Sequence, residues 1–471
     1  MDTTCPNFAR HCGGCPLLAV PYAQQLAQKQ AKLQTLLGRF APVEPVRGMA
    51  QPWHYRNKAI ASFAKQRGEL VCGLYAAGTH RVLPAAGCLL QDETLNRTLQ
   101  AVLAAARACR WTAYDEDRGA GLLRHTVLRC NRRGQVLVTL VTPTPALPGS
   151  RNFCAALHKS APWVVGVVQN INPTATSAVL GDREKTLWGA SFVPDTLCGL
   201  EFAVSSRSFY QVNPAQTEVL YNAALDLAGL DGRQTVVDAY CGIGTIGLCA
   251  APRARQVLGV ERNPAAVRDA IANARRNGQR QARFVCADAT VWMEQAAREG
   301  LRPDVVFLDP PRAGSTPACL GAVARMAPAR VVYVSCCPET LARDTAQLAR
   351  LGYRAQRFVP VDLFPHTEHV ETVVLLSKLN TKQHIEVELN LDELDLTSAE
   401  SKATYDEIKA YVLEKHGLKV SSLYISQVKR KCGLDVGQNY NLSKKEDAKV
   451  PQCPPKKEAA IMEALKYFQM L

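Results

Sequence analysis

Two segments of the sequence pair a thiol with a carboxylate. Cys336 stands in Val-Ser-Cys-Cys-Pro, directly after Arg330-Val-Val-Tyr-Val, an apolar run that predicts a buried parallel strand. Glu371 ends Phe-Pro-His-Thr-Glu-His-Val-Glu and precedes a second strand-like run, Thr372-Val-Val-Leu-Leu. A thiolate nucleophile and a carboxylate base are the pair that methylation of a pyrimidine carbon requires.

That chemistry needs both groups. Uracil C5 is not nucleophilic by itself, but addition of a thiolate to C6 turns C5 into an enolate carbon that can attack a methyl sulfonium. A base must then remove the C5 proton so that the thiolate can leave. Because any strand can end in a cysteine, the pair becomes informative only together with a cofactor site upstream.

The upstream sequence has the order of a nucleotide-binding α/β unit. The β-branched run Thr235-Val-Val-Asp-Ala-Tyr leads into Cys241-Gly-Ile-Gly-Thr-Ile-Gly, and glycines at a strand-to-helix turn let the backbone approach a ligand closely. A second run ends at Glu261, which is placed to accept the two ribose hydroxyls of an adenosine. Asp309 then ends a further strand, in Leu-Asp-Pro-Pro-Arg. This order favours S-adenosylmethionine over a nicotinamide cofactor.

The N-terminus carries a cluster of cysteines. Cys5, Cys12 and Cys15 follow the pattern Cys-x6-Cys-Gly-Gly-Cys-Pro. Three thiolates on a glycine-containing loop can hold zinc or an iron–sulfur cluster, and a cluster takes four cysteines. The fourth must come from elsewhere in the chain, and on spacing alone Cys72 competes with Cys88. The residues leave zinc and a cluster equally open.

Composition bounds the class of protein. The chain has 471 residues, 47% of them hydrophobic, which is enough for several domains with cores. Its 17 cysteines without a signal peptide or a membrane-length apolar run predict a reducing cytoplasm and no membrane span. The net charge of +14 favours a polyanionic partner.

The basic residues change type along the chain. Residues 1–378 contain 35 Arg and 7 Lys, whereas residues 379–471 contain 1 Arg and 13 Lys. This reversal predicts a domain boundary near residue 380. Beyond it we expect a strand over 384–389, a helix capped at 397–400 and ending near His416, and two more helices, over 421–433 and 454–471.

Six segments together resemble one family. They are Ser208-Phe-Tyr-Gln-Val-Asn-Pro, Asp238-Ala-Tyr-Cys-Gly-Ile-Gly-Thr, Gly259-Val-Glu-Arg-Asn-Pro, Asp309-Pro-Pro-Arg, Val334-Ser-Cys-Cys-Pro and His369-Val-Glu. In this order they resemble the RNA 5-methyluridine methyltransferases, especially the 23S ribosomal RNA branch, and the resemblance runs from residue 1 to about residue 378. Two positions depart from the family pattern: Cys337 follows the nucleophile, and Thr245 stands where Asn is common. The small N-terminal RNA-binding barrel of longer members is absent before Cys5.

The resemblance implies roles for individual residues. Cys336 would be the nucleophile and Glu371 the proton acceptor. The cofactor pocket would be lined by Gln211, Tyr240, Thr245, Glu261, Asp288 and Asp309. Cys88 occupies the family's fourth cysteine position, so the resemblance implies a [4Fe-4S] cluster held by Cys5, Cys12, Cys15 and Cys88.

The predicted fold class is α/β, with three domains. Residues 1–200 would form a mixed α/β iron–sulfur and RNA-recognition domain. Residues 201–379 would form a Rossmann-like class I methyltransferase domain that binds S-adenosylmethionine. Residues 380–471 would form a small, Lys-rich and mainly helical extension of unassigned role.

The sequence therefore predicts a cytoplasmic enzyme, expected to be a monomer without an obligate protein partner, that forms 5-methyluridine in 23S ribosomal RNA. The target uracil must leave its stack to reach the pocket. Two alternatives stay open: a tRNA (uracil-C5)-methyltransferase, and a non-catalytic iron–sulfur RNA-binding protein.

Overall fold

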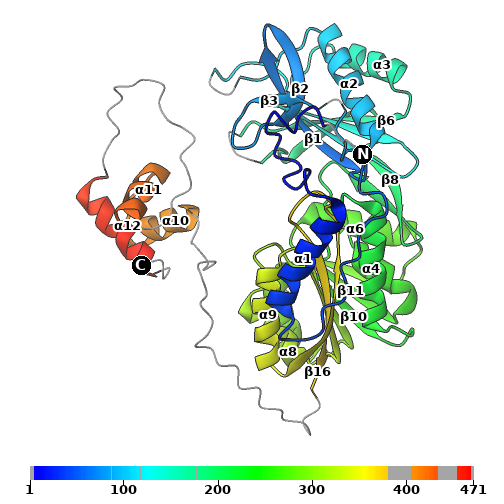
Figure 1. The fold of residues 1–471 in the computed structure, drawn as a ribbon, viewed down its shortest axis with the longest axis vertical. Helices are drawn as coiled ribbons and strands as arrows, with labels where there is room; N and C mark the ends of the chain where they lie inside the picture. The colour runs from blue at the N-terminus through cyan, green and yellow to red at the C-terminus, as the bar shows by residue number, and fades with distance from the viewer. Residues whose placement is uncertain are drawn as a thin grey trace. The chain divides into compact units, whose positions relative to one another are not determined.

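A computed structural model describes residues 5–85, 87–115, 118–174, 178–379, 405–432 and 453–467 of the chain (Figure 1). The chain divides into two compact units, Met1–Gln383 and His384–Leu471. Within the described ranges, no helix is long and apolar enough to cross a membrane.

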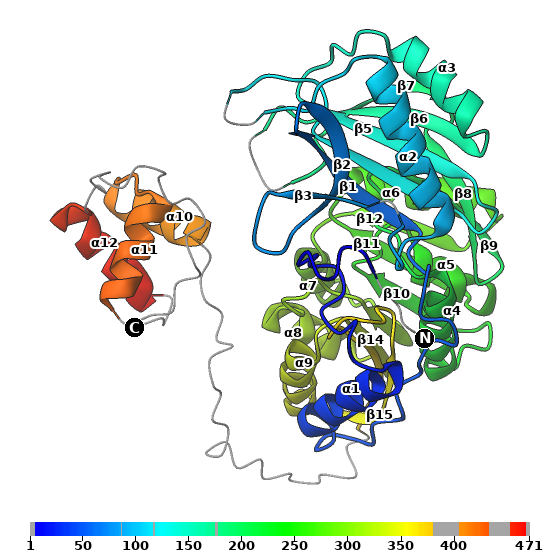
Figure 2. The same ribbon diagram turned by 45° about the horizontal axis from the view of Figure 1, so that its top comes forward.

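A mixed sheet occupies the first half of the first unit. Its seven strands follow the order β3-β2-β1-β4-β5-β6-β7, and all neighbours are antiparallel except β5 and β6. The strands are β1 (Lys58–Gln66), β2 (Glu69–Tyr75), β3 (Val82–Pro84), β4 (His125–Cys130), β5 (Val136–Thr142), β6 (Val164–Ile171) and β7 (Arg183–Gly189). Helices α2 (Glu93–Ala108) and α3 (Ser150–Ser160) pack on one face, which buries a single apolar core (Figure 2).

A second sheet of seven strands follows, after the hairpin β8 (Phe192–Leu197) and β9 (Leu200–Ser205). Its order is β12-β11-β10-β13-β14-β16-β15. The strands are β10 (Thr235–Ala239), β11 (Gln256–Glu261), β12 (Ala282–Cys286), β13 (Val305–Leu308), β14 (Arg330–Ser335), β15 (Tyr353–Val361) and β16 (Glu371–Lys378). The first five run parallel and β16 is antiparallel to both neighbours. Because helices cover both faces, the central strands are continuous apolar runs.

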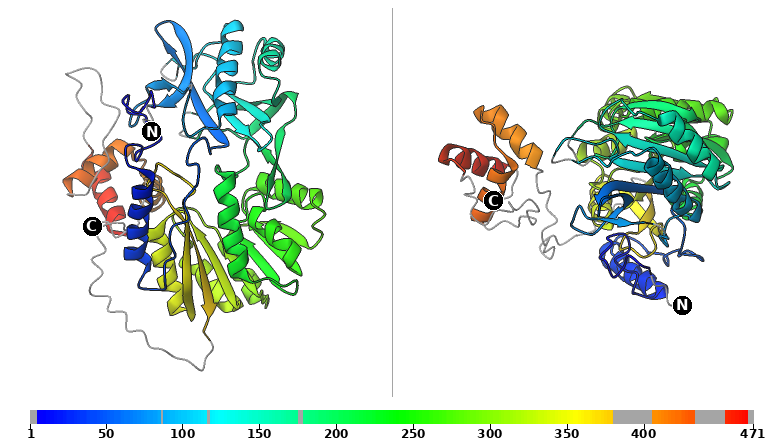
Figure 3. Two further views of the ribbon diagram at one scale, coloured as in Figure 1. Left: turned by 45° about the vertical axis from the view of Figure 1, so that its right-hand side comes forward. Right: turned by 90° about the horizontal axis from the view of Figure 1, so that it is seen from above.

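Helices flank this second sheet on two sides. One face is covered by α4 (Pro214–Ala228), α5 (Thr245–Ala250), the 3₁₀ turn η1 (Ala251–Arg253) and α6 (Pro264–Arg276). The other is covered by α7 (Ala289–Arg298), α8 (Pro317–Met326), α9 (Pro338–Arg350) and the N-terminal helix α1 (Tyr22–Leu37) (Figure 3, left). Leu33 and Leu37 fix α1 to this core, and full burial of each side chain contributes roughly 1.5–3 kcal/mol.

The first and second sheets share part of their core. Leu137 and Val168 of the first sheet pack in the same apolar cluster as Phe202 of β9 and the residues of α4. The boundary expected between residues 200 and 201 therefore lies at the start of β9, inside one compact unit.

Strand order reverses between β10 and β13. From β10 the chain first adds β11 and β12 on one side, then returns to add β13 and β14 on the other. At such a switch point the loops that follow the carboxyl ends of the strands separate and leave a crevice for a ligand. The arrangement is that of an open, doubly wound α/β fold.

The described part of the second unit contains three helices, α10 (Tyr405–His416), α11 (Ser422–Lys431) and α12 (Pro455–Tyr467). They bury their own apolar cluster, which includes Ile408, Ile425 and Ile461. The strand expected over 384–389 and the helix cap expected at 397–400 lie outside the described residues.

Candidate active site and cysteine cavity

A cavity of about 680 Å³ opens at the switch point. Seven of the eight residues predicted to act on or bind the substrates line it: Gln211, Tyr240, Glu261, Asp288, Asp309, Cys336 and Glu371. The eighth, Thr245, is not among the lining residues, and its hydroxyl lies 2.9 Å from that of Tyr221 on α4.

The glycine turn after β10 shapes one wall of this cavity. Tyr240, Gly242 and Gly244 all have positive φ, at 65°, 56° and 82°. A Cβ at Gly244 would lie 2.9 Å from the ring of Phe284, so glycine is required there both for backbone conformation and for space. The side chain of Glu261 accepts from the backbone N–H of Gly242 at 3.2 Å, which ties the turn to the end of β11.

Two carboxyl groups near this cavity have raised pKa values: Asp309 is among the lining residues, and Asp238 is buried in β10. Asp238 accepts the backbone N–H of Gly247 at 2.8 Å and so holds the first turn of α5 against β10. Burial raises the pKa of Asp238 to about 7, and burial also raises the pKa of Asp309 to about 7. These groups bind a proton more readily than an exposed carboxyl, which limits the negative charge next to a bound substrate.

Cys336 and Glu371 are neighbours because of strand pairing. Ser335, the last residue of β14, pairs with Thr372 of the antiparallel strand β16. One residue further along, Cys336 leaves β14 at the edge where Glu371 enters β16, and both line the cavity. The sheet therefore brings together two residues that are distant in sequence.

Burial and neighbouring charges raise the pKa values of both Cys336 and Glu371. Burial, then the Glu371 carboxylate, raises the pKa of the Cys336 thiol to about 11. Burial, then Asp309, raises the pKa of the Glu371 carboxyl to about 8. Arg312 opposes both shifts. Both shifts favour the protonated forms of the two groups when no substrate is bound.

Cys337 occupies a different environment from Cys336. It is the residue before α9, and its sulfur lies 3.4 Å from the carboxylate of Glu339, on the exposed side of the helix start. It is not among the residues that line the cavity. The geometry therefore separates the two adjacent thiols.

Several lining residues were not predicted as site residues. They are Arg56, Phe209, Arg312 and His369, each of which lines the cavity. The side chain of Phe209 is 70% exposed, which is unusual for a large aromatic residue next to a cavity. A guanidinium nitrogen of Arg312 lies 3.4 Å from Nε2 of His369. Both stand within motifs already recognised, Asp-Pro-Pro-Arg and His-Val-Glu, so their motif positions were the available signal.

The four predicted cluster ligands line a second, mainly apolar cavity of about 310 Å³, formed by the N-terminal turns and the first sheet. Cys5, Cys12, Cys15 and Cys88 all face it. Cys72 does not, because it is 3% exposed and packs in the core under α2. The structure thus favours Cys88 over Cys72 as the fourth member of the group.

The thiols of the cysteine cavity lie close enough together to interact electrostatically. Burial, then the charges of Cys88, Cys12 and Cys5, raises the pKa of Cys15 to about 12. Among the described residues, however, no three His, Cys, Asp or Glu side chains stand in a geometry ready to hold a metal ion. Arg56 and Val212 line both this cavity and the cavity at the switch point, which we call the methyltransferase cavity below. The two cavities are therefore adjacent.

Comparisons with known proteins identify the family of this chain. Residues 198–379 match the family described as tRNA (uracil-5-)-methyltransferase. An uncharacterized RNA methyltransferase of Halalkalibacterium halodurans is 42% identical over 386 residues, which cover 81% of this chain and 84% of that protein. One from Bacillus cereus is 41% identical, covering 80% and 83%.

A solved structure is also similar. It is the Pyrococcus abyssi tRNA (uracil-54, C5)-methyltransferase in complex with S-adenosyl-L-homocysteine, with 27% identity and a TM-score of 0.65. The alignment covers 78% of this chain and 86% of that one.

Strand order, glycine turn and acidic strand ends define a class I methyltransferase that uses S-adenosylmethionine. The chain belongs to the RNA 5-methyluridine methyltransferase family, whose members methylate uracil C5 of RNA. It is therefore an enzyme, and the interpretation as a non-catalytic iron–sulfur RNA-binding protein is not supported.

Proposed function

We propose that this enzyme forms 5-methyluridine in 23S ribosomal RNA, acting as a cytoplasmic monomer. The observation that carries the chemistry is the placement of Cys336 and Glu371 at one edge of the switch-point cavity. The excess positive charge of the chain supports a large polyanionic substrate.

In the proposed mechanism Cys336 acts first. Its thiolate adds to C6 of a uracil flipped into the cavity, and the electron pair moves to C5. S-Adenosylmethionine, when bound, supplies the methyl group that C5 takes. The Glu371 carboxylate then accepts the C5 proton, the electron pair re-forms the C5–C6 double bond, and the Cys336 sulfur leaves as thiolate.

The cofactor would occupy the part of the cavity beneath the glycine turn. Glu261, at the end of β11, would accept the ribose hydroxyls, as acidic residues at this position do in related α/β folds. Gln211, Tyr240, Asp288 and Asp309 would complete the pocket wall. Thr245 would act indirectly, because it contacts Tyr221 and not the cavity.

We further propose that Cys5, Cys12, Cys15 and Cys88 hold a [4Fe-4S] cluster. Four thiols around one apolar cavity supply the ligand number and type that such a cluster takes. Its role would be structural or RNA-positioning, because the cavity adjoins the methyltransferase cavity through Arg56. The residues around it supply no proton or nucleophile to the methylation itself.

A tRNA substrate is the second candidate. It is favoured by the similarity to the Pyrococcus abyssi enzyme, which is described as acting on uracil 54 of tRNA. Mass-spectrometric mapping of 5-methyluridine in both RNA pools of a deletion strain separates the two. We expect a 23S rRNA fragment to lose the modification and to regain it when the purified enzyme is added. Loss from tRNA alone would refute the rRNA assignment.

A further inference from the structure

The connection between β15 and β16 leads directly into Glu371, the first residue of β16. It spans residues 362–370 and forms no helix or strand. Five successive backbone carbonyls are nevertheless hydrogen-bonded from other parts of the first unit: Asp362 by Gln216, Leu363 by Asn213, Phe364 by Lys29, Pro365 by Tyr55 and His366 by the N–H of Leu17. An irregular segment with every one of these carbonyls satisfied is held in one conformation.

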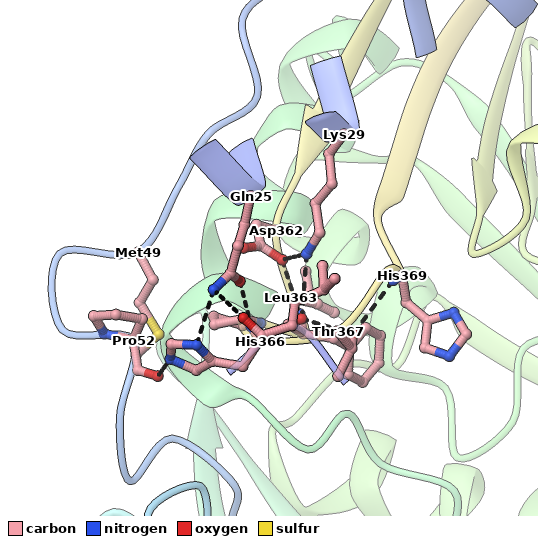
Figure 4. A network of polar contacts seen from close by, with 12 residues as sticks. Gln25, Lys29, Met49, Pro52, Asp362, Leu363, His366, Thr367 and His369 are labelled. Atoms are coloured by element: carbon pink, nitrogen blue, oxygen red, sulfur yellow. Dashed lines mark hydrogen bonds and ion pairs between the residues drawn. The ribbon is translucent and has the colours of Figure 1, made fainter. Parts of the chain in front are cut away.

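Helix α1 supplies a buried ion pair to this connection. The Lys29 ammonium lies 2.7 Å from the Asp362 carboxylate, and the side chains are 3% and 0% exposed (Figure 4). Lys29 also donates to the carbonyl of Phe364 at 3.2 Å. Tyr22, about two turns earlier on α1, donates to the second oxygen of Asp362 at 2.9 Å. Removing one partner of such a pair leaves the other charge buried and uncompensated.

A second contact from α1 fixes His366. The side-chain oxygen of Gln25 accepts the backbone N–H of His366 at 2.8 Å, and its amide nitrogen lies 3.1 Å from Nδ1 of the ring (Figure 4). The other ring nitrogen lies 3.1 Å from the carbonyl of Pro52. Because the carbonyl of Pro52 can only accept, Nε2 carries the proton and donates to it, which leaves Nδ1 as the acceptor of the neutral ring. Burial lowers the pKa of His366, in agreement with a neutral ring.

The backbone at His366 is strained. Its φ is +66°, in the left-handed region that non-glycine residues rarely adopt. The ring of Trp53 stacks on the imidazole at a centroid distance of 3.9 Å. A strained backbone conformation persists only where the surrounding contacts enforce it. The contacts of His366 with Gln25, Pro52 and Trp53 therefore hold its backbone in the left-handed conformation.

We propose that Gln25 and Lys29 are positioning residues for proton removal. With Asp362 and His366 they form a clamp that holds the 362–370 connection so that Glu371 faces the C5 proton. This inference rests on the proposed role of Glu371. The register supports it, because Glu371 pairs with Val361, the residue directly before Asp362. A displacement of Asp362 would therefore move Glu371 as well, because only one peptide bond and one strand pairing separate the two residues.

The clamp also links the active site to the N-terminal cysteines. The amide nitrogen of Gln25, with two N–H groups shared among its neighbours, also lies 3.0 Å from the carbonyl oxygen of Leu17 and 2.7 Å from that of Val20. Leu17 lies two residues after Cys15. The N–H of Leu17 in turn donates to the carbonyl of His366. The segment that carries the cysteines and the segment that carries the base are thus joined at one point.

The test compares Lys29→Met with Lys32→Met in the full-length enzyme. Lys32 lies on the same helix and pairs with Glu339 at 2.7 Å, but both side chains are almost half exposed, so its loss is expected to cost little. The double variant Lys29→Met/Asp362→Asn removes both buried charges and serves if the single variant does not fold. Two quantities are measured: hydrogen–deuterium exchange of residues 362–371, and decay of the methylated protein–RNA adduct.

We expect Lys29→Met to speed exchange in this segment and to slow adduct decay by about 10- to 100-fold, the cost of a misplacement of about 1 Å. Addition of the methyl group should change far less, and Lys32→Met should resemble the unaltered enzyme. If Lys29 had a purely structural role, Lys29→Met would lower the fraction of active enzyme, but the methylated adduct on the active molecules would decay at the normal rate.

Two results would each overturn the clamp while leaving the proposed proton acceptor intact. The first is unchanged hydrogen–deuterium exchange of residues 362–371 in Lys29→Met. The second is faster exchange with normal adduct decay in Lys29→Met, while Glu371→Gln still accumulates adduct. Full turnover by Glu371→Gln would instead refute the proposed proton acceptor, and the catalytic role of the clamp would fall with it.

Discussion

The methyltransferase cavity and the cysteine cavity share Arg56 and Val212, yet they place sulfur in different ways. In the first, Cys336 leaves the end of β14 and its position is set by a sheet. In the second, Cys5, Cys12 and Cys15 lie on N-terminal turns, and Cys88 lies in a connection between β3 and α2.

This difference matches the work expected of each site. A nucleophile must be aligned before its substrate arrives, and a regular sheet provides that alignment. Cluster ligands are aligned by the metal they bind, so turns suffice. Burial, then the other thiols, raises the pKa of Cys15, so this thiol holds its proton more firmly than an exposed one. Under the proposed roles, the active site would be built by the fold, whereas the cysteine site would be completed by its ligand.

The largest expected effect is at Cys336. Cys336→Ala should lower methylation by more than about 10³-fold, because the covalent step is lost. RNA containing 5-fluorouridine should trap the unaltered enzyme as an adduct, since fluorine cannot leave as a proton does. Cys337→Ala is the matched control and should still trap. The reverse pattern would show that the sheet does not select between the two thiols.

The next effect is at Glu371. Glu371→Gln keeps the shape of the side chain and removes its basicity, so adduct should accumulate on natural uridine RNA and turnover should fall by about 10²- to 10⁴-fold. The pKa of Glu371 is raised to about 8, so below that pH most of the carboxyl is protonated and inactive as a base. Adduct decay should rise with pH up to about 8 and then level off. A pH-independent decay in the unaltered enzyme would contradict this role.

The cysteine cavity is tested by Cys88→Ser with Cys72→Ala as its control. Protein purified without air should be brown and contain about four irons per chain. Cys88→Ser should lose most of this iron and its visible absorbance, because one ligand of the cavity is missing, whereas Cys72→Ala should keep both. One equivalent of zinc without colour, or an unchanged cluster in Cys88→Ser, would refute the assignment.

The smallest effect is expected from truncation after Leu379. Every residue proposed for the chemistry precedes this point, and the N–H of Leu379 still bonds the carbonyl of Gly352. The three helices of the second unit have an apolar core of their own. The shortened chain should therefore keep its cofactor affinity and methylate an rRNA fragment within about twofold of the full chain, because it retains every residue proposed for the chemistry. A folded but inactive product would show that the second unit binds substrate.

The sequence by itself determined the methyltransferase class and most of the cavity. Strand ends could be read from apolar runs, and the carboxyl ends of parallel strands meet at one edge of a sheet. Glu261, Asp309 and Cys336 were therefore identifiable from local patterns and their order in the chain. Thr245 shows the limit of this reasoning, because a position in a motif does not say which way a side chain points.

Only the tertiary structure decided the rest. Gln25 and Lys29 have the appearance of ordinary polar residues on an amphipathic helix, and their partners lie more than 300 positions later in the chain. Arg56 is shared by the two cavities, which only the packing of distant segments shows. The resemblance had already implied Cys88, and the structure adds a physical reason, because Cys88 faces the cavity whereas Cys72 packs in the core. Local sequence encodes periodicity and turns, whereas contacts between distant segments depend on how the whole chain packs.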